Sequence, residues 1–142
     1  MESLHPLVVH FPIALLLTAL LTDLLAVALK RPSLHPIALW NLGLGTAGAA
    51  VAVLTGLQAE DIGKHSFEIW QVIERHKRLG IITLILGVGL LAWRLSRRDR
   101  LTPRARWMTI AVMLIMALTV TFGARLGGRL VYEFGVGGRF GR

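Results

Sequence analysis

The chain has 142 residues, of which 54% are hydrophobic and none is cysteine, and its formal net charge at pH 7 is +8. This length allows one domain, the lack of thiols excludes disulfides and a catalytic cysteine, and the apolar fraction exceeds the roughly 45–50% of an ordinary soluble domain. A chain this short could not bury so much apolar surface in a core of its own, so we predict an integral membrane protein.

Four apolar blocks follow one another, separated by short polar segments. They cover about residues 7–29, 36–57, 79–95 and 105–124, and each is close to the ~20 residues that cross a hydrocarbon core as a helix. These blocks predict an all-α, integral membrane four-helix bundle that forms a single transmembrane domain over residues 1–142. No Lys or Arg precedes the first block, so we expect a retained span rather than a signal peptide.

The block ends predict further details of the helices. The first helix begins near His5, and Pro12 then falls inside it and should loosen that turn. The third helix begins outside the membrane near Ser66, because apolar residues recur at helical spacing from there onward. The glycine-rich tail from Gly123 predicts a turn and a short surface segment.

Basic residues crowd the segment between the third and fourth blocks. We interpret them as a juxtamembrane cluster that faces anionic headgroups, and not as a nucleic-acid site. Each end of the bundle carries eight Lys and Arg in total, so the density of this cluster decides the predicted orientation. The first and third connections are predicted in the cytoplasm, with both termini outside. The cluster consists of Arg94, Arg97, Arg98, Arg100, Arg104 and Arg106.

The histidines are the strongest candidates for chemistry. An even number of spans separates the pair His5 and His10 from the pair His65 and His76. These four histidines therefore lie on one side of the membrane, and His35 lies on the other. Two imidazoles at similar depth on facing helices are the ligand set of a b-type haem, and we predict His10 and His76 as the haem or metal ligands. Zinc or copper held by the four histidines is an alternative.

Small residues offer space for a flat macrocycle beside His76. Arg125 and Arg129, at the end of the fourth helix, emerge on the same side and would pair with the propionates. The alternative interpretation is close helix packing, the ordinary role of small residues in membranes. The stripe on the third helix is His76, Gly80, Thr83 and Gly87, and a matching one on the second helix is Asn41, Gly45, Gly48, Ala52 and Thr55.

Asp23 is the one acid deep inside a predicted span. Intramembrane carboxylates are costly, so such a residue is a functional hypothesis by default. Asn41 lies at a similar depth on the second helix, and we predict an Asp23–Asn41 hydrogen bond that clamps the two helices. A proton-coupled transporter that uses Asp23 is a further hypothesis, although one buried acid makes no proton path.

Both ends of the chain carry recognisable motifs. Residues 4–15 read LHPLVVHFPIAL, residues 127–137 read GGRLVYEFGVG, and His76 precedes a Leu-Gly pair. Together they resemble the bacterial membrane proteins known as domain of unknown function 2231. The resemblance implies four transmembrane helices in the bacterial inner membrane and implies no activity. Its motif positions would be His5, Pro6, His10, Pro12, His76 and Gly135, whose clustering on one side strengthens the haem hypothesis, while the Arg139–Arg142 ending departs from the family's apolar ending.

Two function classes follow from these observations. The first is a b-type haem-binding electron-transfer subunit that uses His10 and His76. The second is a non-catalytic subunit that packs against lipid or a partner and carries no cofactor. The sequence holds no nucleophile–base pair, phosphate-binding loop or paired catalytic carboxylates, so an enzyme is the less favoured expectation.

Overall fold

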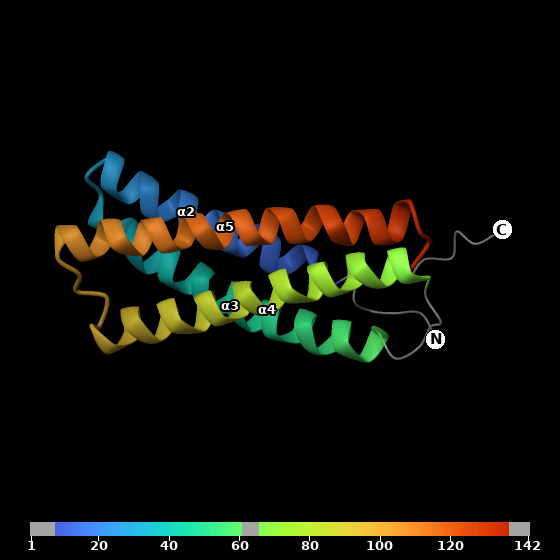
Figure 1. The fold of residues 1–142 in the computed structure, drawn as a ribbon. Helices are drawn as coiled ribbons and strands as arrows, with labels where there is room; N and C mark the ends of the chain where they lie inside the picture. The colour runs from blue at the N-terminus through green and yellow to red at the C-terminus, as the bar shows by residue number, and fades with distance from the viewer. Residues whose placement is uncertain (1–7, 61–65, 137–142) are drawn as a thin grey trace.

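The computed structural model describes residues 8–60 and 66–136. In these ranges the chain forms four long helices and one short turn of 3-10 helix, and no strand (Figure 1). All four long helices are long and apolar enough to cross a membrane, which confirms the all-α four-span fold. They are α2 (His10–Ala28), α3 (His35–Glu60), α4 (Phe67–Ser96) and α5 (Pro103–Tyr132), with η1 (Pro32–Leu34) between α2 and α3.

The helices form a bundle in which neighbours alternate around the axis. Both α2 and α4 pack against α3 and against α5, so α2 and α4 lie diagonally opposite. The connection through η1 and the α4–α5 connection lie together at one end of the bundle, whereas α2 begins and α5 ends toward the other (Figure 1). We call these the loop end and the terminal end. His10 and His76 therefore lie toward the terminal end, and His35 lies at the loop end, as predicted.

Helix starts follow from the local sequence. Ser66 has extended backbone and its Oγ accepts a hydrogen bond from the Ile69 N–H at 3.5 Å, which confirms the predicted start of α4. Thr102 caps α5 in the same way through the Ala105 N–H at 3.3 Å. Since α2 begins at His10, Pro12 lies in its first turn, where a missing backbone N–H costs little. The predicted start near His5 lies outside the described residues.

The prediction that the chain leaves the helix at Gly123 is wrong, because α5 continues to Tyr132. Glycine is a poor helix former in water, but in a membrane bundle it lets helices approach closely. Gly123 and Gly127 face Leu79 and His76 of α4. The helix ends beyond them, where Gly135 adopts a left-handed φ of 65°.

The centre of the bundle is apolar. Leu16, Leu42, Met113 and Met116 are fully buried there. Large apolar side chains such as Trp40 and Ile85 are exposed on the outside of the helices, where a bilayer would cover them. The apolar core ends at Asp23, and polar groups fill the loop end beyond it.

Candidate functional site

Five charged or titratable side chains meet inside the loop end, and we call them the loop-end network. Each of the four helices contributes one member, and the α4–α5 connection contributes the fifth. The members are Asp23 of α2, His35 of α3, Arg94 of α4, Asp99 of the connection and Arg106 of α5.

Asp23 is fully buried and both of its carboxylate oxygens are engaged. Oδ1 accepts from Nδ1 of His35 at 2.7 Å, and Oδ2 accepts from Nη1 of Arg94 at 2.6 Å. Because a carboxylate only accepts, Nδ1 carries the imidazole proton in this contact. The predicted Asp23–Asn41 bond is wrong, since an ionised donor and an imidazole hold the carboxylate more strongly than an amide would.

Arg94 is the centre of the network. Its side chain is fully buried, and its Nε and Nη2 each donate to one oxygen of Asp99 at 2.9 Å, a two-pronged contact. Nη2 also donates to the backbone carbonyl of His35 at 3.1 Å. Arg106 is buried as well and donates to Asp99 Oδ1 at 3.1 Å. The prediction that all six arginines face headgroups is therefore wrong for Arg94 and Arg106.

The network balances its own charge. Two carboxylates face two guanidinium groups, so the buried ions are compensated when His35 is neutral. The side chain of His35 is 17% exposed, whereas Asp23 and Arg94 are fully buried. Breaking a buried ion pair by removing one partner costs about 3–5 kcal/mol, so the network resists separation of the four helices.

The α4–α5 connection is held in an uncommon backbone conformation. Arg98 and Asp99 have φ values of 50° and 52°, in the left-handed region that favours glycine. Such residues cost on the order of 1–3 kcal/mol each unless their surroundings stabilise them. Here the Asp99 N–H donates to the Arg94 carbonyl at 2.7 Å, and the Asp99 side chain pairs with Arg94 and Arg106. The ion pairs therefore fix the path of the connection.

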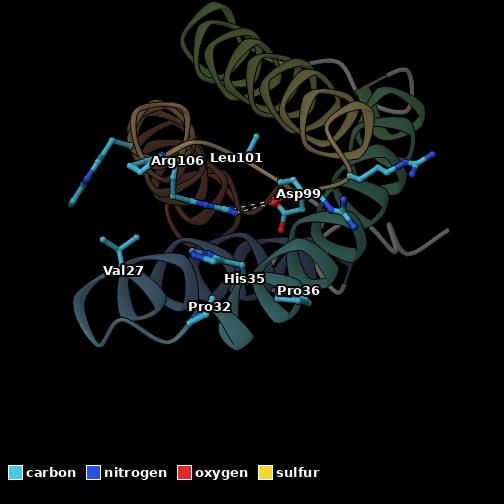
Figure 2. Close-up of a pocket in the computed structure, with 11 residues that line it drawn as sticks. Val27, Pro32, His35, Pro36, Asp99, Leu101 and Arg106 are labelled. Carbon is cyan, nitrogen blue, oxygen red and sulfur yellow. Dashed lines mark hydrogen bonds and ion pairs between the residues drawn. The ribbon is translucent and has the colours of Figure 1, made fainter.

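A cavity of about 510 Å³ opens beside the network. Figure 2 shows it between Pro32 of η1 and His35 of α3 on one side, and Asp99 and Leu101 of the α4–α5 connection on the other. Arg106 reaches across from α5 to Asp99. The cavity thus gives His35 and Asp99 access to the surface at the loop end.

The predicted haem ligands lie at the opposite end. His10 is exposed in the first turn of α2. His76 is half-buried, and its Nδ1 donates to the Gly123 carbonyl of α5 at 2.8 Å. Ligation of haem or metal by His10 and His76 stays a prediction. His5 and His65 lie outside the described residues. Among the residues that the structure describes, no group of three or more His, Cys, Asp or Glu side chains is arranged to hold a metal ion.

The two arginines predicted to hold propionates are exposed on the last turns of α5. Arg129 Nε donates to Glu133 Oε2 at 2.9 Å, one helical turn away, and its guanidinium lies 5.8 Å from the ring of Phe134. Arg125 is exposed near the same end of α5. Pairing of either residue with a propionate stays a prediction.

The small-residue stripes lie against side chains of neighbouring helices. A Cβ atom added at Gly87 would lie 2.7 Å from Thr46 Oγ1, and one at Gly45 would lie 2.8 Å from Leu16. At Gly80 the nearest neighbour would be Val53, at 3.6 Å. Thr83, in the same stripe as Gly80 and Gly87, shares a hydrogen bond of 2.9 Å with Thr119 of α5. These contacts agree with the close-packing interpretation.

The sequence draws attention to Asp23, His35, Arg94 and Arg106 one by one, but not to Asp99 or to the network that the five residues form. In the predicted topology His35 is the one histidine on its side of the membrane, and the sequence groups Arg94 and Arg106 with four neighbouring arginines in one cluster. A signal was available: Asp23 is a buried acid near the same end as Arg94, and an intramembrane charge needs an opposite charge at its own depth.

Comparison with known proteins identifies the family of this chain but does not assign an activity to it. A family model described as a predicted membrane protein (DUF2231) matches residues 1–139. No curated protein and no solved structure matches the chain. With nearly its whole length matched, the chain belongs to the DUF2231 family of membrane proteins.

Proposed function

We propose that the protein is a non-catalytic multi-pass subunit of the bacterial inner membrane, which binds lipid or a partner protein and carries no chemistry between its helices. The observation that carries this proposal is the filling of the small-residue stripes. Positions that lack a Cβ atom on α3 and α4 lie against Leu16, Thr46 and Val53. Glycines in such contacts serve close approach of helices.

The loop-end network favours the same role. Its charges compensate one another and connect all four helices, which suits a rigid unit. A transporter that uses Asp23 would need this carboxylate to exchange partners, whereas both of its oxygens hold donors at 2.6–2.7 Å. On its inner side the carboxylate borders the apolar core around Leu16 and Leu20, so the transporter hypothesis has less support.

A b-type haem held by His10 and His76 in an electron-transfer subunit is the second candidate. The hydrogen bond from His76 Nδ1 to the Gly123 carbonyl favours it, since a ligating imidazole commonly donates its other ring N–H to a carbonyl or carboxylate. The fit along α4 is poor, because a porphyrin face against Gly80 or Gly87 would displace Val53 or Thr46.

Absorption spectroscopy separates the two candidates. The protein is produced in bacteria supplied with excess 5-aminolaevulinate and purified in a mild detergent. We expect no Soret band and a single folded species by size-exclusion chromatography. A Soret band that is lost in both His10→Ala and His76→Ala, and kept in His35→Ala, would overturn the non-catalytic proposal and establish the haem subunit.

A further inference from the structure

The cavity at the loop end has a charged rim. Arg98 and Arg100 line it and are exposed. In residues 8–60 and 66–136, no ion pair or side-chain hydrogen bond joins either guanidinium to another residue. The one acid that lines the cavity, Asp99, is already engaged by Arg94 and Arg106. Among the described residues, the two cations at the rim therefore have no protein counter-charge.

Apart from His35, Asp99 and Arg106 of the loop-end network, the rest of the cavity wall is apolar. Trp107 is 56% exposed and lies on the α5 side, and Leu101 and Pro103 lie between it and the arginines in the chain. Pro32 and Pro36 line the opposite side (Figure 2). Tryptophan is enriched where a membrane helix meets the headgroup layer. A small inorganic anion would use the cations alone, whereas an amphiphile would use both surfaces.

We propose that this cavity binds the phosphate group of an anionic phospholipid headgroup. Arg98 and Arg100 donate to the phosphate oxygens, because a guanidinium offers paired N–H groups that match phosphate geometry. Trp107 and the prolines contact the glycerol backbone and the first methylenes of the acyl chains. Basic pockets between transmembrane helices favour such headgroups. The site is independent of the haem question, since it lies at the opposite end of the bundle.

The full chain, purified in a non-ionic detergent, is titrated with a short-chain phosphatidylglycerol, and bound lipid is counted by native mass spectrometry. Phosphatidylcholine of the same chain length and inorganic phosphate are the comparison probes. We expect phosphatidylglycerol to bind at least tenfold more tightly than either. Equal binding of inorganic phosphate would assign the site to a soluble anion, and equal binding of phosphatidylcholine would remove the role of the uncompensated cations; either result overturns the proposal.

A matched pair of variants tests the location. Arg98→Gln with Arg100→Gln should weaken phosphatidylglycerol binding about tenfold or more, since each cation near anionic lipid contributes appreciably. Arg31→Gln with Arg104→Gln removes the same charge from exposed arginines outside the cavity lining and should change binding less than about twofold. Equal losses in both double variants would show diffuse surface attraction and overturn the site. Trp107→Ala should weaken phosphatidylglycerol binding and leave the weak binding of inorganic phosphate unchanged.

Discussion

Nη1 of Arg94 lies 2.6 Å from Oδ2 of Asp23, across 71 positions of sequence, and neither side chain is exposed. This ion pair joins α4 to α2, the two helices that lie diagonally opposite in the bundle. His35 and Arg106 extend the same contact set to α3 and α5. One buried cluster at the loop end therefore joins all four helices, including the diagonal pair α2 and α4.

Arg94→Ala should destabilise the protein by about 3–5 kcal/mol, because it leaves the buried carboxylate of Asp23 without its charged partner. The measurement is the unfolding free energy in detergent, followed by helical circular dichroism. Arg104→Ala is the control: that arginine is exposed in the first turn of α5 at the same end of the bundle, and its loss should stay within about 0.5 kcal/mol. Similar small effects of the two substitutions would mean that the Asp23–Arg94 pair does not stabilise the fold.

His35→Ala should cost about 1–3 kcal/mol, because it removes the donor to Oδ1 of the buried Asp23. His35→Asn offers an amide N–H near the position of Nδ1 and should restore part of the loss. Thermal melting of the two variants, side by side in one detergent, gives the comparison. If Asn and Ala destabilise equally, the contribution of His35 comes from its packing and not from this hydrogen bond.

How much of the molecule could be predicted differs between the fold and the site. The four spans are predictable because each apolar block is about as long as a helix that crosses a bilayer. The helix caps are predictable because Ser66 and Thr102 carry side-chain oxygens that accept from backbone N–H groups. Asp23 pairs with Arg94, which lies on a helix far along the chain. Arg94 in turn pairs with Asp99, in a connection whose path depends on the left-handed φ of that residue. No local pattern encodes that path. Hydropathy grouped Arg94 with its exposed neighbours because it ignores which face of the helix a residue occupies.

Gly87→Ala should destabilise the bundle by about 1–3 kcal/mol, since the new Cβ atom would lie 2.7 Å from Thr46 Oγ1 of α3 and would force the helices apart. Gly89→Ala is the matched control two residues later. A Cβ atom there meets nothing within 4 Å, so the better helix propensity of alanine should leave stability equal or slightly higher. Thermal melting of both variants gives the answer, and equal losses would refute the packing role of Gly87.

Gly127→Ala probes the contact between α5 and the imidazole of His76. Its Cβ atom would lie 3.1 Å from His76 Cε1, whereas the same change at Gly128 meets nothing within 4 Å. We expect Gly127→Ala to lower the melting temperature and Gly128→Ala to leave it unchanged within error. If haem binds at His76, Gly127→Ala should also shift or weaken the Soret band. Identical behaviour of the two glycine variants would argue against a fixed position of the His76 ring.

The last prediction concerns orientation. Since Arg94 and Arg106 are buried in the loop-end network, the positive-inside argument rests on the exposed basic residues of that end. These are Lys30, Arg31, Arg97, Arg98, Arg100 and Arg104, and they form a dense group that favours the cytoplasmic side.

The absence of cysteine makes this orientation accessible to single-cysteine labelling. Arg100→Cys marks the loop end, and Tyr132→Cys, at a side chain that is 86% exposed, marks the terminal end. In intact cells treated with a membrane-impermeant maleimide that passes the outer membrane, Tyr132→Cys should be labelled, and Arg100→Cys should be labelled only after the inner membrane is permeabilised. The cysteine-free parent gives the background. The opposite pattern would place the loop end outside the cell membrane, and the anionic lipid bound by its cavity would then come from the outer leaflet.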